Sequence, residues 1–403
     1  MTMQPTHVII AGAGYGGLAV AMNLAKSESP TRITVLDRFE HHLLQTRLPQ
    51  VAGGALDPRQ AALPLTALLS SPRVEHRPAA VRGFDLAQHR VLTDRGPWPY
   101  DLLVIALGSE PEDYKIPGLR QHALRLKTLE DAQRISAHIQ RALLRASPQR
   151  QPEASTFVIG GGGASGVELA AELAHALPRW ASPHGLSPGR IRLVLVEAQE
   201  RTLPASPPWM SRYATRALTR MGIEIRLGQP IVEVTDESVR LATGEEIHTQ
   251  TTMWTGGVRA PWLEADLPLG PGRRIWVDPY LRAMGHPEVF AIGDVALIVD
   301  PHTGRPLEPS AQWAVQQGSA VARNIANFLK GRPEIPYRPR RAGELISLGP
   351  TDGVGRIGPL RLRGRPARWA KQLNEVRYLL TLGAWWHTLK WGLPMISASL
   401  DEK

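Results

Sequence analysis

Two stretches of the chain share one pattern of apolar and small residues. Residues 7–25 begin with a β-branched run, Val8 to Ile10, pass through closely spaced glycines and end in an Ala-rich apolar segment. Residues 156–174 repeat the pattern at an offset of 149 positions. A short apolar run, a cluster of glycines and a longer apolar run predict a strand, a tight turn and a helix. We therefore expect an α/β fold built on two copies of one unit.

The glycines of both copies follow one spacing, which is Gly12, Gly14 and Gly17 in the first copy and Gly161, Gly163 and Gly166 in the second. The first glycine permits a sharp turn, the second lets the backbone approach a pyrophosphate, and the third lets helix and strand pack closely. The helix then presents unpaired N–H groups to the phosphates. Two dinucleotide-binding modules in one chain are the expectation.

An acidic residue ends the next predicted strand of each module. Asp37 follows the apolar run 33–36, and Glu197 follows the run 191–196. A carboxylate at this point accepts hydrogen bonds from a ribose diol. Glycines or an acid also follow later apolar strands, at Gly108, at Gly256 and Gly257, and at Gly293 and Asp294. The full predicted cofactor-binding set is Gly12, Gly14, Gly16, Gly17, Asp37, Arg38, Gly108, Gly293, Asp294, Gln312, Gly161, Gly163, Gly166, Glu197, Gly256 and Gly257.

Periodicity places further elements along the chain. Helices are predicted at residues 63–69, 128–145, 209–221 and from 311 onward, and a pair of strands at 74–92 with a turn near 86–89. Residues 147–153, which are polar and contain proline, are predicted to be a boundary between modules. The segment after Asp37 is expected to be a loop or a short helix.

Composition limits the classes of function. A length of 403 residues exceeds one ordinary domain. The chain has no cysteine, which excludes disulfides, thiolate metal sites and redox-active cysteine pairs. No signal peptide or membrane-spanning segment is predicted, and no metal site is expected.

The net charge of +10 is concentrated at the C-terminal end, where residues 336–403 carry 12 Lys and Arg against 5 Asp and Glu. From Trp369 onward, apolar residues recur every three or four positions, at 369, 373, 376 and 380, and at 379, 382, 386, 389 and 393. Four basic residues, Arg368, Lys371, Arg377 and Lys390, interleave with Trp369, Trp385, Trp386 and Trp391. This pattern predicts an amphipathic helix at a membrane interface, with Gly383 as a kink. A helix buried against a partner subunit or its own domain is the alternative.

The order GAGYGG, LD, ALGS, GGGASGVE, VE, WTGGV, FAIGD and AQWAVQQG resembles the two-dinucleotide-binding-domain flavoproteins, and among them the type II, non-proton-pumping NADH:quinone oxidoreductases. The resemblance runs from Val8 to about Gly355. It implies an FAD domain formed by residues 1–118 and 262–335, an inserted NADH domain at 119–261, and a membrane-associating or dimerising region at 336–403. It also implies hydride transfer from NADH to FAD and electron transfer to ubiquinone or menaquinone.

The resemblance assigns roles to particular residues. Glu197 would bind the adenosine ribose and favour NADH over NADPH, although the nearby Arg201 leaves NADPH open. Glu168 would relay a proton near the nicotinamide or the quinone, whereas the alternative is a helix-dipole contact without function. Gln316 and Gln317 are expected to act at the quinone, where Gln312 and Gln316 share a helix face. The alternative is a solvent-facing polar stripe. His41 and His42 are expected at the surface or at the flavin edge.

Departures from the family pattern keep other functions open. Leu44 and Pro49 stand where similar quinone reductases carry aromatic residues, and Leu107 stands where they carry threonine. A soluble NAD(P)H-dependent flavin reductase is the main alternative, and a vestigial flavoprotein that binds nucleic acid is a second. We expect no nucleic-acid partner, a possible homodimer, and a cytoplasmic protein held peripherally on the inner face of the cell membrane.

Overall fold

The structure is a computed structural model and describes residues 5–146, 155–387 and 390. Its internal contacts divide the chain into two compact units. Unit 1 comprises residues 1–42, 63–110 and 258–340, and unit 2 comprises residues 43–62, 111–257 and 341–403. The segments 43–62 and 341–403 therefore belong with the second glycine module. The predicted boundary at residues 147–153 lies outside the described residues.

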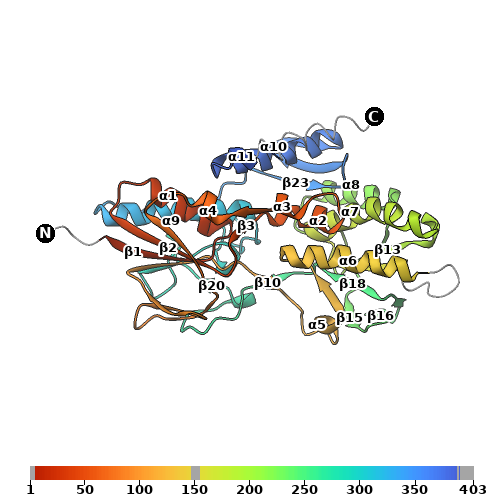
Figure 1. The fold of residues 1–403 in the computed structure, drawn as a ribbon, viewed down its shortest axis with the longest axis horizontal. Helices are drawn as coiled ribbons and strands as arrows, with labels where there is room; N and C mark the ends of the chain where they lie inside the picture. Colours follow the sequence, from red (N-terminus) through yellow and green to blue (C-terminus); the bar gives the residue numbers. More distant parts are fainter. Residues whose placement is uncertain (1–4, 147–154, 388–389, 391–403) are drawn as a thin grey trace. The chain divides into compact units, whose positions relative to one another are not determined.

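Unit 1 is built on a five-stranded parallel sheet, which has the order β21-β9-β1-β2-β5. The central strand β1 is fully buried over its last four residues, which explains its unbroken apolar run. Helix α1 follows the first glycine turn and lies beside α9 (Figure 1). The elements of this layer are β1 (Thr6–Ala11), α1 (Tyr15–Lys26), β2 (Thr31–Asp37), β5 (Val74–Pro78), β9 (Leu102–Ile105), β21 (Val289–Ala291) and α9 (Ala311–Leu329).

Unit 2 repeats this architecture, with a parallel sheet of order β11-β18-β12-β13-β14. Phe157 and Ile159 point to the core under helices α6, α7 and α8, whereas Val158 points to a second core under a small antiparallel sheet. The elements are β11 (Ala123–Arg125), α6 (Leu129–Arg145), β12 (Thr156–Gly160), α7 (Ala164–Ala181), β13 (Arg192–Glu197), α8 (Pro208–Arg220), β14 (Glu224–Leu227) and β18 (Thr251–Trp254).

A three-stranded antiparallel sheet accompanies the parallel sheet in each unit, so the internal repeat extends beyond the glycine turns. These strands are β6 (Val81–Asp85), β7 (Arg90–Thr93) and β8 (Gly96–Pro99) in unit 1, and β15 (Ile231–Val234), β16 (Ser238–Leu241) and β17 (Glu246–His248) in unit 2. The smaller elements of unit 1 are α4 (Leu65–Leu68), β20 (Ile275–Trp276), η5 (Pro271–Arg273), η6 (Gly293–Val295) and β22 (Ala296–Leu297). Those of unit 2 are η1 (Gln45–Arg47), α2 (Leu48–Ala52), α3 (Pro58–Ala61), α5 (Leu119–His122), η3 (Ser182–His184) and η4 (Pro188–Arg190). Four short strands fall at the unit boundaries along the chain, β3 (His41–Leu43), β4 (Ala62–Pro64), β10 (Glu110–Pro111) and β19 (Val258–Arg259).

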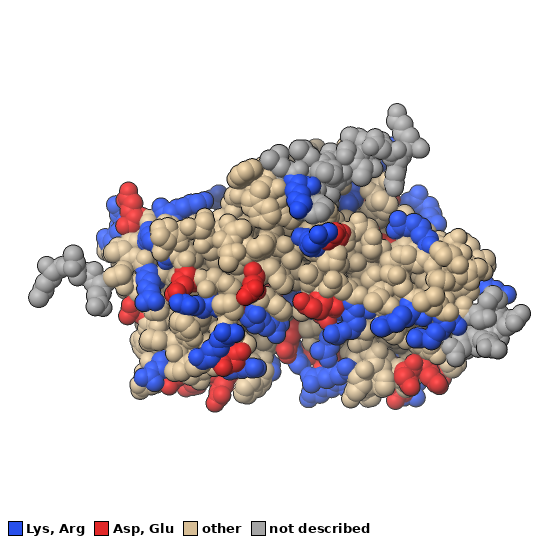
Figure 2. Space-filling model, viewed as in Figure 1, with Lys and Arg blue, Asp and Glu red and all other residues tan. Residues whose placement is uncertain are grey.

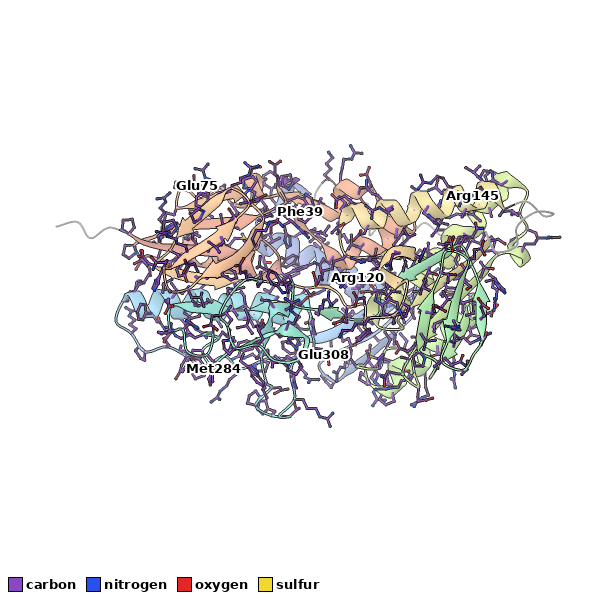
Figure 3. The ribbon with its side chains drawn as sticks, turned by 90° about the horizontal axis from the view of Figure 1, so that it is seen from below. Phe39, Glu75, Arg120, Arg145, Met284 and Glu308 are labelled. Carbon is purple, nitrogen blue, oxygen red and sulfur yellow. The ribbon has the colours of Figure 1, made fainter. Side chains whose placement is uncertain are left out.

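The predicted helices are confirmed where the sequence carries explicit start signals. Helix α6 begins after Thr128, whose side chain and that of Asp131 form a capping box, and it ends at Arg145, labelled in Figure 3. Helix α9 begins after Ser310, whose hydroxyl caps the Trp313 N–H. The prediction for residues 74–92 was wrong in part, because β5 joins the parallel sheet and only β6 and β7 form the hairpin.

The C-terminal segment of unit 2 forms an antiparallel sheet and a helix. Strands β23 (Gly343–Ser347), β24 (Gly353–Ile357) and β25 (Leu360–Arg363) precede α10 (Arg365–Thr381) and the short α11 (Trp385–His387). Gly383 ends α10 rather than kinking it, because it has a φ of 68° and donates to the Leu380 carbonyl, while Ala384 donates to the Leu379 carbonyl. Among the described helices, none is long and apolar enough to cross a bilayer.

Candidate functional site

The first glycine turn has the backbone geometry that a pyrophosphate requires. Gly12 has a φ of 107°, and a Cβ there would collide with the Ala106 carbonyl. Gly14 faces open space, with no atom within 4 Å of a Cβ built on it. Gly17 packs against the Gly12 carbonyl so closely that no side chain fits. The three glycines therefore permit the turn, leave room for a ligand and allow the helix to approach the strand.

The second turn repeats each of these roles. Gly161 has a φ of 104° and lies against Gly256, Gly163 faces open space, and Gly166 packs on the Gly161 carbonyl. Helices α1 and α7 both begin after a glycine that provides no side-chain cap. Their first N–H groups are thus available to an anion, which fits the phosphates of a dinucleotide in each unit.

The two strand-end acids occupy equivalent positions. Asp37 accepts from the Ala13 N–H at 2.6 Å and from the Phe39 N–H at 2.9 Å. Glu197 accepts from the Gly162 N–H at 2.6 Å and from the Gln199 N–H at 2.8 Å. Each carboxylate is thereby fixed beside its own glycine turn, at the carboxyl end of the second strand. This is where the ribose next to the pyrophosphate would lie.

Residues near the first acid divide into two kinds. Arg38 is exposed, with its guanidinium 4.8 Å from the ring centre of Phe39, which Figure 3 labels. His42 is fully buried, and its Nδ1 lies 3.1 Å from the Ala13 carbonyl. Burial lowers the pKa of His42 to about 4, so this imidazole is neutral at physiological pH. Of the two expected positions for His42, the surface position was therefore wrong, because this side chain supports the glycine turn from inside, and the position at the flavin edge stays a prediction.

The remaining predicted residues of unit 1 gather around the Gly293 turn. Ser109, next to Gly108, donates from its hydroxyl to Asp294 at 2.6 Å. The Gly293 N–H donates to Oε1 of the buried Gln317 at 2.7 Å. Gly16 packs against Ile292 and the Ala314 carbonyl. The paired strands β9 and β21, together with helices α1 and α9, thus bring Gly16, Gly108, Gly293, Asp294 and Gln317 together.

Gln312 and Gln316 hold a backbone segment. Both amide nitrogens donate to the Arg340 carbonyl, at 3.2 Å and 2.9 Å, and Gln316 also accepts from the Arg340 N–H at 3.0 Å. The two side chains do share a face of α9, as their spacing indicates. In the structure this face forms hydrogen bonds with the backbone of Arg340.

Gly256 and Gly257 form a tight turn after β18 in unit 2. Gly256 lies on the ring of Trp254, whose indole N–H donates to the Glu112 carbonyl at 2.6 Å. Gly257 has a φ of 96° and faces the Tyr114 hydroxyl. A side chain at either glycine would displace an aromatic ring, so this turn is fixed by packing.

Glu168 lies on α7 and is almost completely buried. Its Oε1 accepts from the Ser347 N–H at 2.8 Å and forms an ion pair with the Lys371 ammonium of α10. Glu168 therefore forms a specific buried ion pair instead of only a contact with the helix dipole. Lys371 was expected to interleave with the tryptophans at a membrane interface. Its side chain is buried instead, so for this residue the structure supports the alternative of packing against the chain's own domain.

Helix α10 has its charged face inward and its apolar face outward. Arg368, Lys371, Gln372 and Glu375, spaced by three and four, are mostly buried, and Glu375 pairs at 3.1 Å with the fully buried Arg47. The opposite face exposes Trp369, Leu373 and Leu380 by 39%, 59% and 55%. Trp385 of α11 is also exposed, whereas Leu379 and Leu382 are buried. Residues 389, 391 and 393 lie outside the described residues.

Sequence reasoning missed the inward-facing partners, namely Lys371, Ser347, Arg47 and Glu375. The spacing of polar residues at 368, 371, 372 and 375 carried a signal, since it defines one helix face. Within the described chain, no group of three or more His, Asp or Glu side chains could hold a metal ion.

The sequence of this chain is similar to those of known proteins. Residues 6–318 match the family model described as pyridine nucleotide-disulphide oxidoreductase. The type II NADH:quinone oxidoreductase of Staphylococcus haemolyticus is 30% identical over 391 residues, which cover 95% of this chain and 97% of that protein. The enzyme of the same name from Staphylococcus epidermidis is likewise 30% identical, with the same coverage.

Solved structures show the same fold. NDH2 from Plasmodium falciparum, in complex with NADH, superposes with a TM-score of 0.85 at 17% identity, covering 96% of this chain and 98% of that one. The sulfide:quinone oxidoreductase of Aquifex aeolicus gives a TM-score of 0.77 at 21% identity, covering 94% and 91%. From these matches and the two glycine turns, the chain belongs to the pyridine nucleotide-disulphide oxidoreductase family, and within it to the type II NADH:quinone oxidoreductases.

Proposed function

We propose that this chain oxidises NADH through a bound FAD and reduces a membrane quinone without pumping protons. The observation that carries the proposal is the pair of glycine turns, each with open space at its second glycine and a carboxylate beside it. Two such turns in one chain suit one dinucleotide that stays bound and one that exchanges. FAD, when bound, supplies hydride acceptance and electron transfer to the quinone.

The residues divide between the two nucleotides. In unit 1, Gly12, Gly14, Gly17 and Asp37 would hold FAD, with Gly108, Gly293 and Asp294 along its length. In unit 2, Gly161, Gly163, Gly166 and Glu197 would hold NADH, with Gly256 and Gly257 at the later strand end. Glu197 would accept from the adenosine ribose and repel a 2′-phosphate, which favours NADH over NADPH.

Glu168 and Lys371 supply the proton chemistry in this proposal. Quinone reduction to quinol consumes two protons, and a buried carboxyl paired with an ammonium can hold and release one. The Ser347 N–H and Lys371 fix the position of Oε1, so the carboxyl is oriented before any substrate binds. The Glu168–Lys371 pair therefore holds one proton, which the pair would give to the acceptor, and the Glu168 carboxylate is the group through which that proton is replaced.

Gln316 and Gln317 act in this proposal chiefly by positioning. Gln317 holds the Gly293 N–H and Gln316 holds the backbone of Arg340. The Gln317 amide nitrogen would then donate a hydrogen bond to a quinone carbonyl. Gln312 supports the same Arg340 segment from the adjacent turn.

The exposed face of α10 suits a membrane surface. Trp369, Leu373 and Leu380 form an apolar stripe, and the exposed Arg365 and Arg377 border it. A helix of this kind lies in the lipid interface, and its basic residues contact anionic headgroups. We propose peripheral attachment to the inner face of the cell membrane, with a homodimer contact as the competing use of the stripe. On the face drawn in Figure 2, basic and acidic side chains are interspersed.

Steady-state turnover tests the proposal. The FAD-loaded protein should oxidise NADH when a water-soluble quinone is supplied, and much more slowly with NADPH. Reduction of a dye acceptor without reduction of any quinone would instead identify a flavin reductase with another acceptor. Absence of NADH oxidation with every acceptor would refute the enzyme assignment.

A further inference from the structure

One face of α7 carries three titratable side chains in a row. Glu168, Glu172 and His175 are spaced by four and three residues, so they share a side of the helix. Glu168 and Glu172 are only 7% and 4% exposed, and His175 is half-buried. The row therefore runs from the proposed proton donor toward the protein surface.

Glu172 differs from Glu168 in its hydrogen bonding. Glu168 is fixed by Ser347 and Lys371, whereas Oε1 of Glu172 is enclosed and has no hydrogen-bond partner among the described residues. On its other side, Gly53 packs so closely that a Cβ there would lie 3.0 Å from the Glu172 Cβ. An enclosed carboxyl oxygen without a partner is costly as a structural element and requires an explanation.

The charged groups around Glu172 act in opposite directions. Burial raises the pKa of Glu172, Arg368 lowers it, Glu168 raises it, and Lys371 and His175 lower it. Arg368 and Lys371 come from α10, and Glu168 and His175 from α7 itself. The short helix α2, which precedes Gly53, carries no ionisable side chain. Because burial favours the neutral carboxyl and the two cations favour the carboxylate, Glu172 can exchange a proton with its neighbours.

We propose that Glu172 resupplies Glu168 with protons and is itself recharged from solvent through His175. The inference rests on the proposed quinone reduction, which consumes a proton at each donation by the Glu168–Lys371 pair. The Glu172 carboxyl passes its proton to the Glu168 carboxylate and becomes a carboxylate. The His175 imidazolium then returns a proton to Glu172 and regains one from water, so charge balances and no electrons move. Glu172 acts through Glu168 and is a positioning and relay residue rather than a catalytic one.

The test compares Glu172→Gln with Glu172→Asp and with Glu130→Gln, which removes an exposed acid on α6. For Glu172→Gln we expect quinone-dependent kcat to fall about tenfold or more, in the lower range of losses for general acid–base groups. The deficit should grow as pH rises, because protons become scarcer. Flavin bleaching by NADH should keep its rate, Glu172→Asp should recover most of the activity, and Glu130→Gln should match the wild type.

A second measurement does not depend on turnover. Burial raises the pKa of Glu172 in the folded chain, so its neutral carboxyl stabilises the fold fully at pH values below the pKa that Glu172 has in the unfolded chain. This contribution is lost as the pH rises through the pKa of the folded chain. Thermal unfolding should therefore show Glu172→Gln gaining stability over the wild type between pH 5 and pH 8.

Three outcomes separate the possibilities. A folded Glu172→Gln with the wild-type kcat–pH profile overturns the relay and leaves the proposed function intact. Wild-type protein without quinone turnover overturns both. If Glu172→Gln does not fold, His175→Gln replaces it, and a kcat–pH profile unchanged from the wild type then counts against the relay.

Discussion

Lys371 of α10 and Glu168 of α7 form a buried ion pair between residues 203 positions apart in the chain. The pair joins the helix of the second glycine module to the C-terminal helix of unit 2. It also explains why α10 turns charged residues inward, since Lys371 can reach Glu168 only from that face. The same contact is the proton-handling group of the proposed reaction.

Removing one partner of this pair should be costly. Lys371→Met leaves the Glu168 carboxylate buried without its cation, and we expect a loss of about 3 kcal/mol in the free energy of unfolding. Combining Lys371→Met with Glu168→Gln should recover most of that loss, while quinone reduction stays low. Denaturant unfolding of both variants measures the effect.

The matched control is the exposed pair of Lys330 and Glu28, in which Glu28 is 93% exposed. Lys330→Met should leave stability nearly unchanged, because exposed pairs contribute little. Equal losses in Lys371→Met and Lys330→Met would show that the buried pair has no special role.

Acid should weaken unit 1 through His42. Its folded pKa of about 4 lies below the ordinary 6.5, so the folded state resists protonation. The stabilisation is complete above pH 6.5 and is lost as pH falls toward 4, by about 2 kcal/mol at pH 5. Asn can donate to the Ala13 carbonyl without titrating, so His42→Asn should lose less stability than the wild type between pH 7 and pH 5. Parallel losses in the two proteins would remove His42 as the cause.

Glu197 should control the choice of nicotinamide nucleotide. Glu197→Ala removes the carboxylate that would accept a hydrogen bond from a ribose hydroxyl. We therefore expect kcat/KM for NADH to fall about tenfold or more. Preference over NADPH should shrink by a similar factor, because repulsion of the 2′-phosphate disappears. Steady-state kinetics with both nucleotides measures this, and Glu200→Ala, which removes a nearby exposed acid, is the control. A preference for NADH that survives Glu197→Ala would assign selectivity elsewhere.

The apolar stripe of α10 should hold the protein on lipid. Replacing Leu373 and Leu380 together with Ser is expected to weaken binding to anionic liposomes about tenfold or more, since each exposed leucine loses apolar contact with the bilayer. Activity with a water-soluble quinone should persist. Asn374→Ser changes an exposed polar residue of the same helix and serves as the control. Unchanged sedimentation with liposomes, together with a dimer that dissociates in the double variant, would reassign the stripe to a subunit contact.

The sequence predicted features that depend on local spacing. Gly12, Gly14 and Gly17 and their repeat predict both turns, because the first and third glycine of each set leave no room for a side chain and the second keeps space open for a ligand. The roles of Asp37 and Glu197 could be predicted because each acid comes directly after an apolar strand pattern. The parallel sheets follow from unbroken apolar strands that alternate with helices.

The sequence did not reveal contacts between distant segments. The polar spacing around Lys371 marks one face of α10, but it does not identify Glu168 as the partner, and the neighbours Trp369 and Leu373 favour a lipid-facing interpretation. Glu375 of the same helix pairs with Arg47 of η1, and these two residues come together only in the folded chain. His42 has no local signal of burial, since its partner is a backbone carbonyl in the glycine turn.

Anaerobic titration follows the reduction and the reoxidation of the flavin in one experiment. The FAD-loaded protein is titrated with NADH while the visible flavin absorbance is followed, and a quinone is then added. We expect the absorbance to bleach with NADH and to return with quinone, because both half-reactions belong to one chain. Bleaching without recovery would contradict the assignment of a quinone acceptor, and a protein that binds no FAD would contradict dinucleotide binding at the first glycine turn.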